Sequence, residues 1–170
     1  MAERELLLLG LLRRENMHGY KLNEFIENDL AICTDLKKPT AYFLLDKMAK
    51  QGWIEQYDET QSGGRPPRRM FRITAAGESV FQDLLRARLK TFDPARFTAD
   101  PALAFVDALD SAEAHALLSQ RRAGLAAELD TMRAVPEHPG TFGFVIAHRI
   151  AHLEAELRWI DDVIAHLRAL

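Results

Sequence analysis

The stretch Lys38-Pro-Thr-Ala-Tyr-Phe-Leu-Leu-Asp-Lys-Met-Ala-Lys-Gln-Gly52 predicts a short amphipathic helix. Pro39 is favourable at the first helical position, and Gly52 is favourable just beyond the last turn. The opposite side carries hydrogen-bond donors, aromatic rings and positive charge. One face of this helix is therefore expected to join a core, while the other stays free for a ligand or partner. The residues expected to pack inward are Ala41, Leu44, Leu45 and Met48.

A two-stranded ribbon is expected directly after this helix, over Trp53–Asp58 and Met70–Thr74. Its connection, Gln61-Ser-Gly-Gly-Arg-Pro-Pro-Arg-Arg69, is basic and contains no acidic residue. The two glycines permit a tight turn, and the two prolines stiffen it. A helix followed by a hairpin with a basic tip is typical of the winged helix-turn-helix. In that fold the second helix enters the DNA major groove and the wing contacts phosphates.

The flanking sequence predicts the helices that support this motif. Leucines cover more than one face of a helix over residues 2–14, which indicates burial on several sides. A second amphipathic helix is expected over about residues 20–30. Thr74 is a suitable N-cap for a helix over residues 75–92. The inward residues of that helix are expected to be Val80, Phe81, Leu84, Leu85 and Leu89.

The prolines and irregular pattern of residues 93–101 predict a linker. It would separate a winged-helix domain over residues 1–92 from a helical domain over residues 100–170. The second domain should contain a short helix over about 101–109, holding Leu103, Phe105, Val106 and Leu109, and a helix to about 134 opened by Asp110-Ser-Ala-Glu113. The last helix, 141–169, repeats apolar residues at heptad spacing, which predicts pairing within or between subunits. This seam consists of Ile146, Ile150, Leu153, Leu157, Ile160, Ile164 and Leu167.

Composition and charge restrict the class of protein. The 170 residues carry a net charge of −3, but residues 61–72 contain four arginines and no acid. A local basic patch is compatible with DNA binding because the footprint depends on the contacting face. The single cysteine, Cys33, excludes a disulfide within the chain and favours a reducing cytoplasm. No stretch approaches a membrane span in length.

The candidate DNA contacts lie on the amphipathic helix and in the basic connection. The hydroxyls can donate to phosphates or base edges, although the tyrosine alternatively packs inward. The lysines are either DNA contacts or solubilising charges. The arginines suit phosphates or a narrow minor groove, and the alternative for them is a solvated turn. These candidates are Thr40, Tyr42, Lys47, Lys50, Arg65, Arg68 and Arg69.

Other candidates lie on the last helix. Trp159 adjoins the seam and favours interface packing, with an aromatic ligand pocket between subunits as the alternative. His148, His152 and Glu156 have a spacing that can present two imidazoles to a metal. No third histidine or cysteine cluster is in register, so a polar helix flank is the favoured interpretation. We expect no metal or cofactor, and no catalytic motif is present, which argues against an enzyme.

A series of motifs follows the leucine-rich first helix in a specific order and spacing. They are His18-Gly-Tyr20, Tyr42, Lys50-Gln-Gly-Trp-Ile54 and Gly63-Gly-Arg-Pro-Pro-Arg-Arg-Met-Phe-Arg-Ile-Thr-Ala-Ala-Gly77. Together these motifs resemble the PadR family of bacterial transcription regulators over about residues 3–92. The resemblance implies a homodimeric DNA-binding regulator, usually a repressor, in some cases released by a small aromatic ligand. The two-fold symmetry of such a dimer predicts a pseudo-palindromic operator. The run Pro39–Phe43 departs from the family at the start of the recognition helix, so only the tyrosine carries over.

Two alternatives belong to other functional classes. The first is a winged-helix module that binds another protein and has no affinity for DNA. The second is a sensor whose main role is to capture a small molecule in an aromatic-lined pocket. Salt-dependent duplex binding distinguishes the regulator from the first alternative.

Overall fold

The computed structural model describes residues 2–18, 21–22, 24–25, 36–59, 68–136 and 140–167. The chain divides into two compact units, Met1–Pro94 and Ala95–Leu170. This division falls inside the segment 93–101, where the sequence predicts a linker. Each unit has buried apolar residues of its own.

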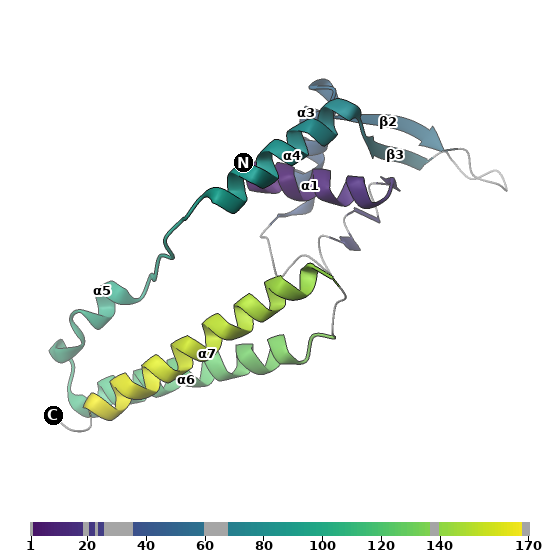
Figure 1. Cartoon of the computed structure of the whole chain (residues 1–170). Helices are drawn as coiled ribbons and strands as arrows, with labels where there is room; N and C mark the ends of the chain where they lie inside the picture. Colours follow the sequence, from purple (N-terminus) through teal and green to yellow (C-terminus); the bar gives the residue numbers. More distant parts are fainter. Residues whose placement is uncertain are drawn as a thin grey trace. The chain divides into compact units, whose positions relative to one another are not determined.

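The first unit combines three described helices with a small sheet (Figure 1). Its strand β3 lies between β1 and β2, and both pairings are antiparallel. The prediction of a mainly helical fold with a small β wing is confirmed. Strand β1 was not predicted, because two residues are too few to show alternation. The elements are α1 (Ala2–Arg14), β1 (Met17–His18), α3 (Lys38–Lys50), β2 (Ile54–Glu59), β3 (Arg68–Ile73) and α4 (Ala75–Lys90).

Helix α1 is the centre of the first unit, where it packs against α3, α4 and β3. Arg13 at its C-terminal end donates to Glu78 of α4 over 2.8 Å, and its guanidinium lies 5.6 Å from the centre of the Phe81 ring. The expectation that α1 is buried on several sides is confirmed by the leucines Leu8, Leu9, Leu11 and Leu12. The second helix expected over 20–30 lies largely outside the described residues, although Leu22 is described and fully buried.

The turn after α3 connects directly to the start of α4. Gly52 has a positive φ of 72°, which suits glycine because it carries no Cβ. The Thr74 hydroxyl accepts from the Gly77 amide over 3.1 Å and donates to the Gly52 carbonyl over 2.6 Å. Thr74 is therefore the predicted N-cap of α4, and it also fixes α4 to the end of α3.

The second unit consists of the short helix α5 (Asp100–Leu103), the 3-10 helix η1 (Val106–Ala108), and the long helices α6 (Ser111–Arg133) and α7 (Phe142–Leu167). Helices α6 and α7 lie side by side (Figure 1). The Asp110 carboxylate caps α6 by accepting from the Glu113 amide over 2.9 Å, as predicted. One continuous helix over 101–109 is wrong, because Phe105 leaves helical geometry at φ −125° and ψ 22° and separates α5 from η1.

The heptad seam of α7 contributes to the core of its own chain. Ile160 and Ile164 are buried in a cluster with Leu118 of α6. The remaining seam residues range from buried Ile146 to half-buried Ile150, Leu153, Leu157 and Leu167. At least part of the predicted helix pairing is therefore made between α6 and α7 of one chain.

One apolar side chain expected to point inward is exposed in the single chain. Leu89 is 80% exposed, so its assignment to the core of this chain is wrong. Phe105 and Leu117 are also exposed. Helical periodicity identifies an apolar face but does not say what covers it. Among the described residues, none of the helices has both the length and the apolar character needed to cross a membrane. The remaining exposed large apolar residues are Phe43, Phe92, Phe97, Leu109, Phe144 and Trp159.

Candidate nucleic-acid interface and small-molecule pocket

Helix α3 presents an exposed stripe opposite its buried face. The four predicted inward residues are all buried, which confirms the periodicity argument. On the other side, Pro39, Phe43, Asp46 and Lys50 are exposed and follow the spacing of one helical face. Phe43 is 65% exposed, so its ring is accessible on this free face. Phe43 was not among the predicted contacts, although its place on the free face was visible in the sequence.

The remaining predicted contacts of α3 are less accessible. Thr40 and Tyr42 are half-buried. The Lys47 ammonium donates to the Glu5 carboxylate over 2.7 Å, and the Glu5 side chain is only 9% exposed. This ion pair attaches α3 to α1. Glu5 was missed by the sequence analysis because it lies 42 residues away in the chain and its acidic side chain resembles an ordinary surface residue.

The structure places two of the predicted wing arginines in strand β3. Arg69 pairs in register with Asp58, and Arg68 pairs with Glu59. The connection itself contains no acid, but acidic residues therefore occupy the neighbouring strand. The Arg69 side chain is exposed and makes no hydrogen bond or ion pair with the part of the chain that the structure describes. Arg65 lies outside the described residues.

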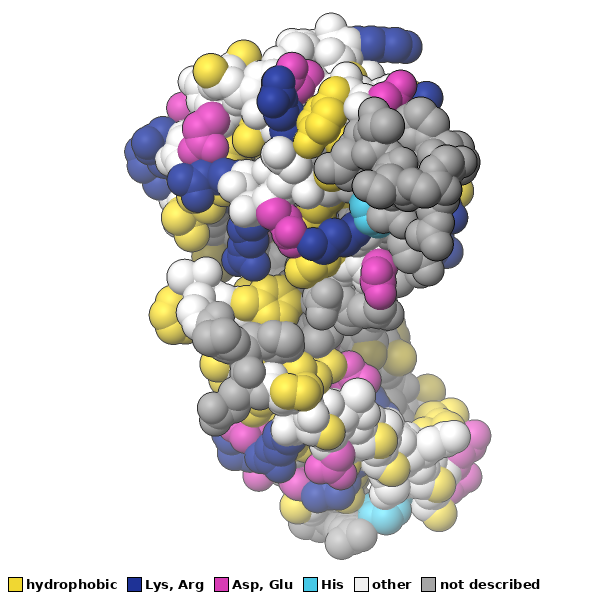
Figure 2. Space-filling model, turned by 90° about the vertical axis from the view of Figure 1, so that its right-hand side faces the viewer, with side chains coloured by type: hydrophobic (Ala, Val, Ile, Leu, Met, Phe, Trp, Pro, Cys, Tyr) yellow, Lys and Arg dark blue, Asp and Glu magenta, His cyan; other side chains and the backbone are white. Residues whose placement is uncertain are grey.

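Arg72, three residues after Arg69 in β3, already interacts with residues of β2. Its guanidinium donates to Glu55 on β2 and lies 5.3 Å from the centre of the Tyr57 ring. The hydrogen bond from Arg72 lowers the pKa of Glu55, and the same bond raises the pKa of Arg72. Both groups therefore stay charged at neutral pH, and Arg69 is the better placed of the two arginines to contact an external anion. On the face shown in Figure 2, basic and acidic side chains are interspersed.

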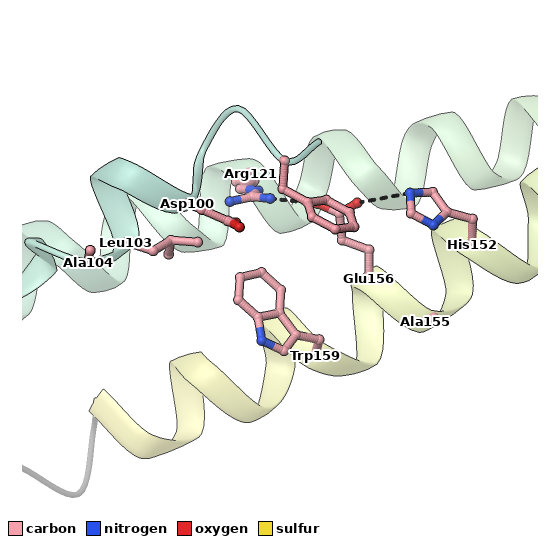
Figure 3. A pocket seen from close by; sticks show the side chains of 9 residues that line it. Asp100, Leu103, Ala104, Arg121, His152, Ala155, Glu156 and Trp159 are labelled. Carbon is pink, nitrogen blue, oxygen red and sulfur yellow. Dashed lines mark hydrogen bonds and ion pairs between the residues drawn. The ribbon is translucent and has the colours of Figure 1, made fainter. Parts of the chain in front are cut away.

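A pocket of about 630 Å³ lies within the second unit, bounded by α5, α6 and α7 (Figure 3). This volume is within the range of sites for small organic ligands. Trp159, the predicted candidate for ligand binding, is one of its walls and is 40% exposed. The lining residues are Phe97, Asp100, Leu103, Ala104, Arg121, His152, Ala155, Glu156 and Trp159.

The polar residues of this pocket are connected to each other. Arg121 of α6 donates to Glu156 of α7 over 2.6 Å, and the Arg121 guanidinium lies 5.5 Å from the Trp159 ring centre. Glu156 also lies 3.8 Å from His152, whose ring stacks on Phe97 with centroids 6.0 Å apart. Glu156 and His152 thus form part of the pocket. The structure describes no group of three or more His, Cys, Asp or Glu that could hold a metal ion.

The pocket was only partly visible in the sequence. His152 and Glu156 were candidates because of their spacing on the last helix, and Trp159 was a candidate because it adjoins the heptad seam. Asp100 and Arg121 carried no comparable signal, since they belong to two other elements. Their approach depends on the packing of α5 and α6 against α7.

Comparison with known proteins gives a family match within the first unit. Residues 8–83 match the family described as the transcriptional regulator PadR-like family. The prediction of a regulator rather than an enzyme is confirmed by this family, because its members are described as regulators.

The complete fold is similar to several solved structures. Bacillus subtilis PadR in complex with operator DNA is 20% identical with a TM-score of 0.80, covering 98% of this chain and 99% of that chain. The same Bacillus protein in complex with p-coumaric acid is 18% identical with a TM-score of 0.76, covering 96% and 94%. The Vibrio cholerae virulence activator AphA is 15% identical with a TM-score of 0.75, covering 98% of each chain. At these identities the likeness establishes the fold.

Proposed function

Because residues 8–83 are a domain of the PadR-like family of transcriptional regulators, we propose that this chain binds DNA sequence-specifically as a homodimeric repressor in the cytoplasm. The observation that carries this proposal is the exposed stripe of α3 beside the β2–β3 wing. A helix with a free polar and aromatic face next to a hairpin is the arrangement that places side chains in the major groove and the wing on the backbone. The complex of Bacillus PadR with operator DNA supports this use of the fold.

Helix α3 would supply the contacts that distinguish sequences. Phe43 is exposed and apolar, and it suits the C5-methyl group of thymine, which only the major groove presents. Lys50 is exposed and cationic, so it suits a phosphate or a guanine edge. Thr40 and Tyr42 would donate to phosphates from the margin of the helix. Lys47 would act mainly by holding α3 against α1 through Glu5.

The wing would contribute contacts that do not read sequence. Arg69 is exposed and has no partner within the described residues, so its guanidinium is available for phosphate oxygens. Arg68 belongs to β3, and Arg65 precedes it in the sequence. Both are proposed to contact phosphates or the minor groove. Each phosphate contact releases counterions, so wing binding should weaken with salt.

The second unit, together with the end of the first unit, is proposed to pair two copies of the chain. Large apolar area is exposed in a single copy at Leu89 and Phe92 of the first unit and at Phe105 of the second, which favours burial by a partner. The half-buried seam residues Ile150, Leu153 and Leu157 retain area for the same purpose. A two-fold dimer would present two α3 helices to half-sites of a pseudo-palindromic operator.

A small aromatic effector is proposed to control operator binding through the pocket that contains Trp159. The binding of p-coumaric acid by Bacillus PadR supports effector control in a protein of this fold. A ligand shifts the equilibrium only if it binds one arrangement of the dimer better than another. The protein would leave the operator if, in the favoured arrangement, the distance between the two α3 helices no longer matches the spacing of the half-sites.

Duplex binding tests the proposal. Fluorescence anisotropy would compare the DNA immediately upstream of the coding region with a random duplex, each at low and high salt. We expect tighter binding to the upstream duplex and weaker binding as salt rises. Phe43→Ala should reduce the preference for the upstream duplex. Arg69→Ala should weaken binding to both duplexes and lower the slope of log affinity against log salt concentration by about 1.

Lys90→Ala is the matched control for these variants. Lys90 is an exposed cation in the last turn of α4, away from α3 and the wing strands. The Lys90→Ala variant should bind both duplexes with the same affinities as the original protein. Equal affinity of the original protein for both duplexes would contradict sequence-specific binding. Absence of binding to either would favour the protein-interaction module instead.

A further inference from the structure

We propose that the pocket bounded by α5, α6 and α7 binds a flat aromatic cation. This inference rests on the proposed effector-controlled regulator and specifies the chemical class of the effector. It depends on which charges inside the pocket already have partners and on the character of the walls. All of the residues involved belong to the second unit.

The charges in the pocket leave one carboxylate uncompensated. Glu156 takes the hydrogen bond of Arg121, so this acid and base neutralise each other. Asp100 makes no hydrogen bond or ion pair through its side chain with any residue that the structure describes. In Figure 3 its carboxylate and the Trp159 ring project toward the same space. Asp100 is exposed, and a cationic group placed there would form an ion pair that no described residue provides.

The other lining residues suit a flat, largely apolar ligand that carries a positive charge. Trp159, Phe97 and Leu103 contribute aromatic and aliphatic surface, and the lining also includes two alanines, Ala104 and Ala155. Aromatic ring faces attract cations, as the position of Arg121 over Trp159 already shows. The volume of about 630 Å³ accommodates a ligand of two or three fused rings.

An aromatic anion faces a less favourable pocket. The guanidinium of Arg121 is the basic group on the lining besides the imidazole of His152, and it is already bonded to Glu156. A ligand carboxylate could use only the guanidinium N–H groups that Glu156 leaves unbonded, and it would then lie beside the Glu156 carboxylate, which repels it. It would also approach the unpaired Asp100. The same ring system should therefore bind better with a positive group than with a negative one.

Isothermal titration calorimetry with three probes of one ring system tests this inference. The probes are naphthylmethylammonium, naphthoate and naphthylmethanol, which are positive, negative and neutral. The full chain would be titrated without DNA at about pH 8, where a histidine side chain is ordinarily uncharged. We expect the cation to bind at least tenfold tighter than the anion and several-fold tighter than the neutral alcohol.

Two matched variants locate the cation. Asp100→Asn should reduce binding of the ammonium probe to the level of the alcohol and leave the alcohol unchanged. Asp107→Asn removes an exposed acid from η1, outside the pocket lining, and should leave all three affinities unchanged. Circular dichroism would verify that both variants keep the helical content of the original chain.

The outcomes separate this inference from the proposed function. Naphthoate binding as tightly as the ammonium probe, or no probe binding to the folded chain, would overturn the inference whatever the duplex assay shows. An unchanged ammonium affinity in Asp100→Asn would overturn it as well. Cation selectivity that depends on Asp100, together with absent duplex binding, would sustain the pocket assignment and refute the DNA-binding regulator.

Discussion

At position 77 the backbone leaves no space for a side chain. A Cβ placed on Gly77 would lie 1.9 Å from the carbonyl oxygen of Trp53, and backbone cannot rotate away as a flexible side chain does. We expect Gly77→Ala to lower the free energy of unfolding by about 2 kcal/mol or more, because α4 must move away from the turn after α3. Urea unfolding followed by circular dichroism measures this change.

Ser79→Ala provides the comparison for that variant. Ser79 is exposed on the same helix, and alanine has the higher helix propensity. Its unfolding free energy should change by less than about 0.5 kcal/mol. A similar loss of unfolding free energy in both variants would mean that α4 tolerates no substitution in this region. The contact with Trp53 would then not be the cause.

Individual side chains were predictable where helical periodicity alone decides their burial. Ala41 and Met48 are buried as expected, because both lie on the apolar face of one short helix. The partner of Lys47 was not predictable, because Glu5 belongs to another helix. The position of Arg69 opposite Asp58 depends on the register of two strands, and a one-residue shift would have changed it.

At the scale of elements, exposed ion pairs join helices within each unit. Arg13 of α1 donates to Glu78 of α4, and Arg122 of α6 donates to Asp161 of α7. These hydrogen bonds lower the pKa of Glu78 and of Asp161. A carboxylate with a lowered folded-state pKa stabilises the fold above its unfolded-state pKa, and this contribution is lost as pH falls through the folded-state value.

We therefore expect the unfolding free energy to decrease as pH falls from about 6 to about 3, with Glu78→Gln showing a smaller decrease than the original chain. The variant should be less stable at neutral pH and nearly equal at the acidic end, where Glu78 is protonated in either state. Urea unfolding across this range measures both slopes. Glu24→Gln, whose acid makes no ion pair within the described residues, should keep the original slope. Parallel curves for all three proteins would exclude a role for the Arg13–Glu78 bond.

The sequence was sufficient to predict the type of each long element, but it did not predict the short elements. Helix α6 begins at the predicted cap Asp110, and α4 begins after the predicted cap Thr74. Strand β1 has too few residues for a pattern, and the break at Phe105 has no proline or glycine to announce it. The seam of α7 was visible as a repeat, but the repeat does not specify whether α6 or a second subunit packs against it.

At the scale of the whole molecule, the exposed apolar residues predict self-association. Leu89 is 80% exposed in the single chain although it repeats with the inward face of α4. Leu89→Glu should weaken the dimer by about tenfold or more, because a charge would be buried without a partner. Sedimentation velocity over a range of protein concentrations measures the dissociation constant.

Lys90→Glu is the control for charge at this end of α4. It introduces the same acid at the neighbouring exposed position, whose side chain does not lie on the apolar face. A monomeric original chain at high micromolar concentration would contradict the proposed dimer directly. Equal weakening by both variants would indicate an electrostatic effect of the added acid and not the loss of an apolar contact.

The pocket could not be derived from the sequence because it is a property of three segments together. Trp159 was identifiable as a candidate from its place beside the seam, whereas the approach of Asp100 and Arg121 requires the packed second unit. The wing was identifiable from composition, yet the acids on β2 that oppose its arginines appear only once the strands are paired. In both cases the missing information is the juxtaposition of distant segments.

The ion pair between Glu5 and Lys47 has a consequence for how such a regulator diverges after gene duplication. The ion pair makes the orientation of α3 depend on a residue of α1 that is outside the proposed DNA contacts. Lineages selected for new operators should therefore accumulate substitutions at Glu5 as well as on the exposed stripe of α3. A recognition helix transplanted between two such lineages would lose its specificity unless the first helix were transplanted with it.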